Sequence, residues 1–186
     1  PKLAAMGIDQ IRGDIADRQT VQRACAGVEL VFHVAAKPPP WGKYRDYYTT
    51  NVSGTQNVID ECIRSKIARL VYTSTPSVVF DGTDMQGVDE SVPYPAKFSA
   101  FYPETKAKAE QLVRKATGQR LRTVVLRPHQ IWGPGDPHFV PRLIARAREL
   151  KRIGNGKNLV DTTYIDNAAE AHVLAADRLA ENPAIS

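Results

Sequence analysis

Short apolar runs rich in β-branched residues alternate along this chain with longer segments whose apolar residues recur at helical spacing. The clearest runs cover residues 28–35 (VELVFHVA), 69–74 and 121–126. Runs without polar alternation are typical of strands buried on both faces. Helical patterns over 46–65 and 100–117 lie between them. Because strand–helix–strand connections cross over with one hand, we expect an α/β fold with a doubly wound parallel sheet.

The remaining elements are expected in shorter or more polar segments. A short extended run over 9–12 ends at Gly13, and Asp17 can cap a helix that reaches residue 26. Two later helices are expected over 138–151 and 167–180. Since the sequence has no repeat, low-complexity tract or internal boundary, we expect a single domain.

Composition excludes several classes of protein. Of the 186 residues, 42% are hydrophobic and 24% charged, which is sufficient for one sizeable core. The longest uncharged apolar stretch, residues 30–36, is far too short to span a bilayer, so we expect no transmembrane segment. No secretion signal is present, and a cytoplasmic location is expected. Cys25 and Cys62 are too few for a disulfide framework or a cysteine zinc site, and no metal is expected.

The charge of the chain is mildly basic, with 25 Lys and Arg against 20 Asp and Glu. The basic residues are scattered, and the densest group, Arg142 to Arg152, alternates with apolar residues at helical spacing. An anionic cofactor or substrate explains this balance as well as a nucleic acid does. We therefore expect no nucleic-acid partner.

Small or polar residues follow each expected strand. In open parallel sheets, ligands bind beyond the carboxyl ends of the strands, so these residues are predicted to line one cofactor crevice. Each taken alone could instead be a turn residue or bond to local backbone. The four groups are Gly13-Asp14, Ala35-Ala36-Lys37, Thr73-Ser74-Thr75-Pro76 and Arg127-Pro128-His129.

Tyr102 and Lys106 stand four residues apart in a segment expected to be helical, so their side chains share one face. A nearby ammonium group stabilises a phenolate and lowers a tyrosine pKa from about 10. Such a tyrosine can exchange a proton with an alcohol oxygen, which a Thr or Ser hydroxyl at a neighbouring strand end can hold. The pair therefore indicates acid–base chemistry, and the alternative is an exposed tyrosine packed over a lysine side chain.

Over essentially its whole length the chain resembles the extended short-chain dehydrogenase/reductase family. That resemblance implies a Rossmann-like fold and an NAD(P)-dependent enzyme. The blocks that carry it stand in the family's order: residues 13–17 (GDIAD), 31–36 (VFHVAA), 51–58 (NVSGTQNV), 73–78 (TSTPSV), 102–106 (YPETK), 126–128 (LRP), 131–134 (IWGP) and 164–167 (YIDN).

The resemblance implies a role for each matched catalytic residue. Thr75 corresponds to the hydroxyl that holds the substrate oxygen, with Ser74 as the second choice, and Tyr102 corresponds to the acid–base. Lys106 would hold the nicotinamide ribose and lower the pKa of Tyr102. Asn51 would lie in a kinked helix and support a water of the proton relay, and the alternative for Asn51 is simple side-chain-to-backbone bonding.

The resemblance also implies NAD or NADP as cofactor. Asp14 and Ile15 would lie along the adenine, whereas Pro128 and His129 would border the nicotinamide carboxamide. His33 is expected to be a packed strand residue. The cofactor contacts expected are Asp14, Ile15, Ala35, Ala36, Lys37, Thr73, Tyr102, Lys106, Pro128 and His129.

One part of the family's pattern is not found in this sequence. Family members begin with a strand, a Gly-x-x-Gly-x-x-Gly turn and a helix whose N-terminus binds pyrophosphate. The glycines near 133–135 and 154–156 lie in late loops instead. We therefore expect residues 1–186 to be part of an NAD(P)-binding domain, with the start of the substrate lobe around 129–165. Such a part is expected to bind cofactor poorly on its own, and NAD cannot be told from NADP in it.

Residues 127–134 (RPHQIWGP) distinguish two branches of the family. Many nucleotide-sugar epimerases and dehydratases carry Arg-x-x-Asn-x-Tyr-Gly-Pro, and Gln130 and Trp132 depart from that pattern. The Arg-Pro-His start and residues 154–161 (GNGKNLVD) look more like the 3β-hydroxysteroid dehydrogenase branch. That branch includes sterol-4α-carboxylate 3-dehydrogenases and bacterial 2-alkyl-3-oxoalkanoate reductases.

Apolar residues over 38–41 (PPPW) and 98–101 flank the expected site. Such walls suit an apolar ligand, although ordinary loop anchors would look the same. The expected substrate contacts are Ser74, Trp41, Gln130 and Trp132.

The function expected from the resemblance is interconversion of a 3-hydroxy and a 3-oxo group on a 2-alkyl-3-oxo acid or a sterol-like substrate, in lipid metabolism. The alternative enzyme is a nucleotide-sugar epimerase or dehydratase, and the alternative outside catalysis is a cofactor-sensing module. By analogy with the family, a homodimer would form through helices 46–65 and 100–117.

Overall fold

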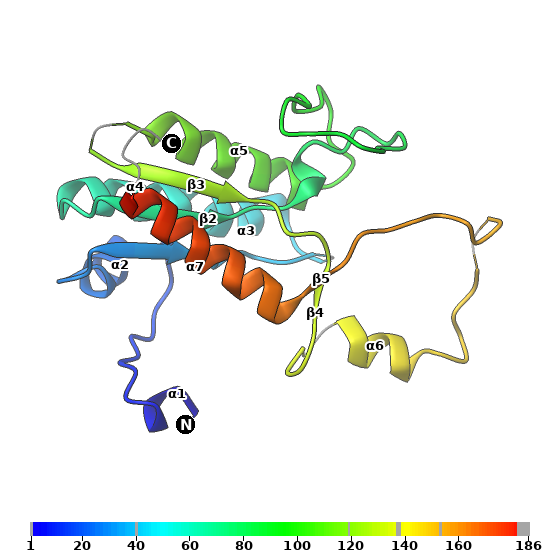
Figure 1. Cartoon of the computed structure of the whole chain (residues 1–186), viewed down its shortest axis with the longest axis horizontal. Coiled ribbons are helices and arrows are strands. Elements are labelled where there is room, and N and C mark those ends of the chain that lie inside the picture. Colours follow the sequence, from blue (N-terminus) through cyan, green and yellow to red (C-terminus); the bar gives the residue numbers. More distant parts are fainter. Residues whose placement is uncertain (1, 40, 119, 137–138, 153, 182–186) are drawn as a thin grey trace.

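The central element of the fold is a sheet of three parallel strands. A computed structural model of the chain describes residues 2–39, 41–118, 120–136, 139–152 and 154–181. Within these residues the strands pair in the order β1 (Leu30–His33), β2 (Arg69–Thr73) and β3 (Arg122–Leu126). Because all three run in the same direction, their carboxyl ends meet at one edge (Figure 1). The prediction of a parallel sheet is confirmed.

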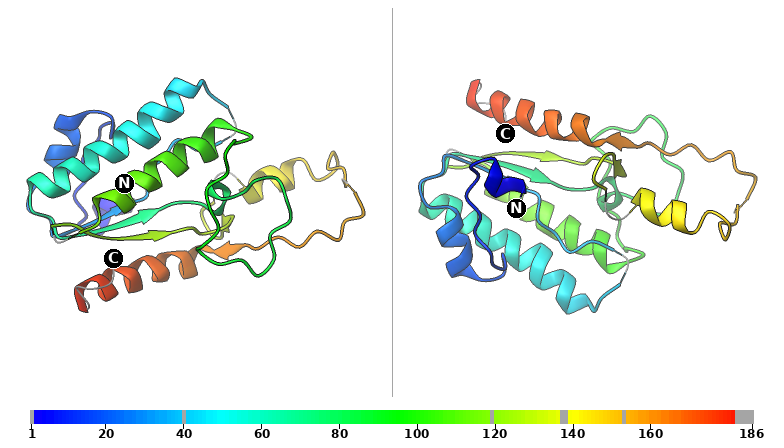
Figure 2. Two further views of the ribbon diagram at one scale, coloured as in Figure 1. Left: turned by 90° about the horizontal axis from the view of Figure 1, so that it is seen from above. Right: turned by 90° about the horizontal axis from the view of Figure 1, so that it is seen from below.

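Helices cover both faces of this sheet (Figure 2). On one face lie α4 (Gly54–Arg64) and α5 (Phe101–Ala116), and α2 (Arg18–Ala24) packs against α4. On the other face α7 (Ile165–Glu181) packs against β2 and β3. The arrangement of helix, sheet and helix confirms the α/β fold with a Rossmann-like layering.

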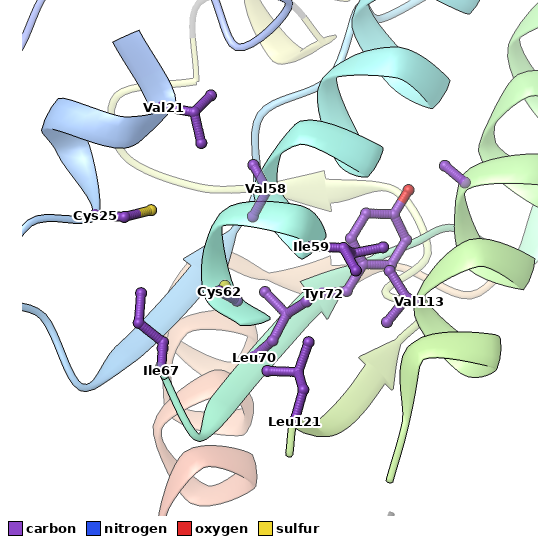
Figure 3. Packing of buried hydrophobic residues seen from close by; sticks show 11 residues of the cluster. Val21, Cys25, Val58, Ile59, Cys62, Ile67, Leu70, Tyr72, Val113 and Leu121 are labelled. Atoms are coloured by element: carbon purple, nitrogen blue, oxygen red, sulfur yellow. The ribbon is translucent and has the colours of Figure 1, made fainter. Parts of the chain in front are cut away.

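Side chains of β2 alternate between two hydrophobic cores. Leu70 and Tyr72 join the cluster beneath α2, α4 and α5, where Cys62 and Val113 pack against them (Figure 3). Val71, between them in sequence, joins the opposite cluster against α7. Because both faces of β2 are buried, its residues read as a continuous apolar run without polar alternation.

The segment expected as one helix over 46–65 is divided in the structure. It consists of α3 (Tyr44–Tyr47), a π-helix (Tyr48–Ser53) and α4 (Gly54–Arg64). A π-helical turn takes one residue more than an α-helical turn, and such turns often lie at functional sites. Gly54 follows it because a Cβ there would lie 2.7 Å from the side chain of Ile15. The kinked helix that the family resemblance implies around Asn51 is thus present.

Other expected elements differ in length. Residues 9–12 form no strand, and the helix expected over 138–151 is reduced to α6 (Phe139–Ala145), with residue 138 outside the described residues. None of the residues of α6 is buried, so packing does not extend this helix to the length that its apolar spacing indicates. A short N-terminal helix α1 (Lys2–Ala5) was not expected.

A second, small sheet lies beyond β3. It pairs β4 (Ile131–Trp132) in parallel with β5 (Thr163–Tyr164), which leads directly into α7. Between these strands α6 and the loop after it extend to one side of the layered body (Figure 1). Throughout the described ranges, no helix combines the length and the apolar character that crossing a membrane requires.

Candidate active site

Three of the expected catalytic residues come from the carboxyl end of β2 and the first two turns of α5. Thr75 follows β2 and caps the 3-10 helix Pro76–Val78, since its hydroxyl accepts a hydrogen bond from the Ser77 N–H. Tyr102 lies in the first turn of α5, and Lys106 lies one turn later. A proline at position 103 suits this first turn, where its missing N–H is not needed.

The ammonium group of Lys106 is buried and held on two sides. Its Nζ donates to the Tyr72 hydroxyl at 2.7 Å and to the Thr73 carbonyl oxygen, also at 2.7 Å. The side chain is 2% exposed, and burial lowers the pKa of Lys106 to about 8 against the opposing charge of Glu110. An ammonium group has three N–H donors, so one remains for a ligand after these two bonds.

The hydroxyl of Tyr102 is half-buried beside that of Thr75. Burial raises the pKa of Tyr102 above its usual 10.0, and a hydrogen bond from Thr75 offsets only part of this rise. The lowering expected from the spacing of Tyr102 and Lys106 is therefore not found in the structure without cofactor. The reason is geometric, because the Lys106 ammonium is bound to Tyr72 and Thr73 instead.

Asn51 joins the loop after β1 to the start of α5. It is buried in the π-helix, where its Oδ1 accepts from the Lys37 N–H at 2.7 Å and its Nδ2 donates to the Thr105 hydroxyl at 3.0 Å. Thr105 in turn donates to the carbonyl oxygen of Phe101. The side chain of Asn51 thus holds the loop after β1 against the start of α5. This role requires neither helix capping nor contact with the reacting atoms.

A buried carboxylate, Glu110, accepts hydrogen bonds from three separate segments. Ser74 donates to it from the end of β2, Tyr94 donates at 2.9 Å, and Arg127 binds it through two guanidinium nitrogens from the end of β3. Burial alone would raise the pKa of Glu110, but the bonds from Arg127, Ser74 and Tyr94 outweigh it and hold the pKa below 4.5. Ser74, expected as a substrate contact, is committed to this carboxylate.

The expected adenine contacts are anchored to α4. Asn57 donates to the backbone carbonyl oxygens of Ile15 and Ala16, both at 3.0 Å, and the Asp14 carboxylate accepts from the Ala16 N–H. Ile15 packs under the core while Asp14 is exposed. The cofactor role of Asp14 and Ile15 stays a prediction.

Residues beyond the strand ends differ in exposure. After β1, Ala35 is exposed and Ala36 half-buried. After β2, the hydroxyl of Thr73 pairs with His172 of α7 at 2.7 Å, so this side chain turns toward the helix on the far face. After β3, Pro128 is half-buried and His129 exposed.

The other expected substrate contacts differ in exposure and in how firmly packing holds them. Gln130 adopts a positive φ of 37°, and its carbonyl oxygen accepts from Thr163, which joins β4 to β5. Trp132 is 40% exposed and stacks edge-on against Tyr164 at 5.3 Å between ring centres. Trp41 is 84% exposed in the loop after β1, so no packing fixes it, and Pro40 beside it lies outside the described residues.

Two residues of the site were missed by the reading of the sequence. Glu110 stands four residues after Lys106, so Tyr102, Lys106 and Glu110 recur at helical spacing on one face of α5. This spacing in the sequence could have identified Glu110. Tyr72 gave no such signal, because an aromatic residue in an apolar strand is indistinguishable from core.

Acid is expected to destabilise the protein through His33. This side chain is 3% exposed, and burial followed by the charge of Lys106 lowers its pKa to about 4 from 6.5. Between those values only the unfolded state binds the proton, so the free energy of unfolding falls by about 3 kcal/mol from pH 6.5 to pH 4. Urea unfolding of the full-length protein at several pH values measures this loss. His33→Asn keeps a side-chain donor but cannot titrate, and an equal loss in that variant would contradict the assignment.

Together, the parallel sheet and the helices on both faces define a Rossmann-type fold, with a threonine, a tyrosine and a lysine at the carboxyl edge of its sheet. The comparison with solved structures agrees with this fold. A UDP-glucuronic acid 4-epimerase from Bacillus cereus in complex with NAD superposes with a TM-score of 0.78 at 28% identity, over 94% of this chain and 59% of that one.

The chain belongs to the 3-beta hydroxysteroid dehydrogenase/isomerase family, whose model matches residues 2–186. The family expected from residues 127–134 and 154–161 is thereby confirmed.

Two curated relatives show the range of the family around this chain. A 2-alkyl-3-oxoalkanoate reductase of Stenotrophomonas maltophilia (strain K279a) is 54% identical over 99% of this chain and 57% of its own length. The decarboxylating sterol-4-alpha-carboxylate 3-dehydrogenase of Homo sapiens is 41% identical over 91% of this chain and 47% of its own. The chain thus spans about half the length of the curated relatives it matches.

Proposed function

We propose that the full-length protein containing this chain is an NAD(P)-dependent oxidoreductase that interconverts a 3-oxo and a 3-hydroxy group on an apolar substrate, with 2-alkyl-3-oxo acids as the favoured class. The observation that carries the proposal is the gathering of Thr75, Tyr102 and Lys106 at the carboxyl edge of the sheet. The 2-alkyl-3-oxoalkanoate reductases at 54% and 48% identity support the substrate class.

The residues present fit a nicotinamide dinucleotide. Lys106 keeps one donor that the described residues do not use, which suits a ribose hydroxyl, and Ala35 and Ala36 offer small side chains where the chain leaves β1. Asp14, Ile15, Lys37, Thr73, Pro128 and His129 complete the proposed contacts. When bound, the cofactor supplies or accepts the hydride at the carbon that bears the oxygen.

The chemistry of the chain's own residues is proton transfer at one oxygen. Because its pKa is raised, Tyr102 is protonated at neutral pH and can donate to a carbonyl oxygen as that oxygen gains negative charge. Thr75, bonded to Tyr102, can donate to the same oxygen and hold it in place.

Substrate binding is assigned to residues around the same edge. Gln130 and Trp132 lie just beyond β3, where Trp132 presents an exposed aromatic face to an apolar chain. Trp41 joins them in this proposal as a residue free to close over a ligand. The proposal also retains the homodimer expected through helices 46–65 and 100–117, which span residues 44–64 and 101–116 in the structure. Light scattering of the full-length protein tests it.

The deciding experiment follows nicotinamide absorbance with the full-length protein, each cofactor, and three substrates in parallel: a long-chain 2-alkyl-3-oxo acid, a 3-oxosteroid and a UDP-sugar. We expect consumption of NADH or NADPH with the oxo acid, and loss of that consumption in Tyr102→Phe. Turnover of the UDP-sugar without net consumption of cofactor would instead place the protein with the epimerases.

A further inference from the structure

Residues 13–17 form neither helix nor strand, yet local contacts fix their conformation. Gly13 lies so close to a side chain of α2 that a Cβ would not fit there. The Asp14 carboxylate accepts from the Ala16 N–H at 2.9 Å, and the Asp14 carbonyl oxygen accepts from the Asp17 N–H at 3.0 Å. Asp17 then caps α2 through two N–H groups of its first turn. A loop with this many internal bonds loses little conformational freedom when a ligand binds to it.

Asn57 of α4 ties this loop to the helical layer. Its Nδ2 donates to the carbonyl oxygens of Ile15 and Ala16, each at 3.0 Å, and thereby uses both of its protons. Its Oδ1 accepts from Nε of Arg18 at 3.2 Å. Because carbonyl oxygens only accept and a guanidinium group only donates, the amide has a single orientation that satisfies all three partners. Asn57 is 8% exposed, so little water reaches this amide.

The side chain of Ile15 meets the same face of α4. Gly54 stands three residues before Asn57, so the two positions are neighbours on the helix surface. A Cβ at Gly54 would lie 2.7 Å from the Ile15 side chain, which therefore rests directly against the helix backbone. Helix α4 thus holds the loop twice, through the backbone at Asn57 and through the side chain at Gly54, while the Asp14 carboxylate stays exposed.

We infer that Asn57 is a positioning residue for the adenine half of the dinucleotide cofactor. It acts through the carbonyl groups of Ile15 and Ala16, and these bonds keep Asp14 and Ile15 where the proposed adenine contacts lie. The inference rests on the proposed oxidoreductase function, because the adenine contacts belong to that proposal. It separates two tasks, since Asn57 affects binding of the cofactor and the proton transfer at Tyr102 proceeds without it.

The test compares Asn57→Asp with the unchanged full-length protein by isothermal titration calorimetry. Aspartate has the same size but no proton to donate, so its carboxylate would face two carbonyl oxygens and the loop should leave α4. We expect Kd for the preferred nicotinamide dinucleotide to rise by about tenfold, the effect of a lost preorganised contact surface. Kd for ADP-ribose, which carries the adenine half without the nicotinamide ring, should rise by the same factor. For an enzyme that prefers NADP, the probe is ADP-ribose 2′-phosphate.

Steady-state kinetics supply the second readout. In Asn57→Asp, KM for the cofactor should rise with its Kd, whereas kcat at saturating cofactor should stay within about twofold, because the interaction acts on binding alone. A residue whose loss merely loosened the fold would lower kcat as well.

Gln56→Glu is the matched control. It makes the same change from amide to carboxylate one residue earlier and adds the same negative charge near an anionic ligand. Gln56 donates to Asp60 on its own helix at 2.7 Å, so both Kd values should stay within about twofold. Hydrogen exchange reports on the loop without any ligand, because the Asp17 N–H should exchange faster in Asn57→Asp than in Gln56→Glu.

Two results would overturn the inference. One is an equal Kd for ADP-ribose in Asn57→Asp and Gln56→Glu, and the other is a rise in Kd for the dinucleotide that ADP-ribose does not share. If Asn57→Asp does not fold, Gly54→Ala decides, because its Cβ displaces Ile15 from α4 and should weaken ADP-ribose binding in the same way. Unchanged binding in Gly54→Ala would then refute the inference.

The proposed function and this inference fail in different ways. A full-length protein that binds neither NAD(H) nor NADP(H) would refute the proposed function, and the adenine role of Asn57 with it. A protein that binds and turns over its cofactor, but is indifferent to Asn57→Asp, would refute this inference alone.

Discussion

Replacing Tyr102 with phenylalanine is expected to lower kcat of the full-length protein on its oxo-acid substrate by about 10²- to 10⁴-fold, the usual contribution of one positioned proton donor. The variant loses only the hydroxyl that bonds to Thr75, so its Tm should stay within a few degrees of the unchanged protein. The measurement pairs steady-state kinetics with thermal unfolding.

A matched control for this result is Tyr48→Phe, which also removes one tyrosine hydroxyl but outside the proposed site. Tyr48 lies in the π-helix, is 41% exposed and packs on Tyr44 with 5.9 Å between ring centres. If Tyr102→Phe kept more than a tenth of the activity while folded, Tyr102 would not be the proton donor.

The second large effect concerns the ion pair between Arg127 and Glu110. Arg127→Met is expected to lower the free energy of unfolding by about 3 kcal/mol, because it leaves a carboxylate that is 1% exposed without its cation. Ser74 and Tyr94 still donate to Glu110, so the loss is smaller than that of a carboxylate without partners. Denaturant unfolding measures the change.

The control substitution is Arg114→Met. Arg114 is exposed and contacts the same network through one long bond to Tyr94 at 3.4 Å, so its loss should cost less than 0.5 kcal/mol, the order of a surface contact. The double variant Glu110→Leu with Arg127→Met should recover much of the stability, since it removes both buried charges. Equal losses of unfolding free energy in Arg127→Met and Arg114→Met would show that burial of the Glu110 carboxylate does not set the size of the effect.

The pH dependence of this pair has a defined sign. The pKa of Glu110 is held below 4.5 in the folded state, so the pair's contribution is complete above pH 4.5 and is lost as pH falls through the lowered value. Arg127→Met should therefore differ most from the unchanged protein at neutral pH and converge with it in acid.

The three strands of the central sheet were predictable because one physical signal, an apolar run without polar alternation, marks each of them. Leu70, Val71 and Tyr72 are apolar in succession because they fill two cores on opposite faces of the sheet, and Val124 and Val125 of β3 do the same. The pair Tyr102 and Lys106 was also predictable, because its spacing and its position after β2 are both local properties of the sequence.

The parts that could not be predicted depend on packing between distant segments. Glu110 and Arg127 meet only after α5 docks beside β3, and neither residue type indicates its partner. The tyrosine pKa was predicted in the wrong direction because the position of the Lys106 ammonium is decided by Tyr72 on another element. Likewise, the end of α6 depends on contacts that its own apolar spacing cannot report.

The π-helix between α3 and α4 makes chain length in this segment as important as residue identity. Each residue of a helix adds about 100° of rotation, so deleting one residue between 48 and 53 would turn α4 by about that angle relative to α3. Val58 and Cys62 would swing off the sheet while Tyr47 kept its place. Related sequences are therefore expected to keep the number of residues over Tyr48–Ser53 even where residues other than the buried Asn51 and Val52 vary. A gap placed there in an alignment would mark a different rotation of α4 relative to α3.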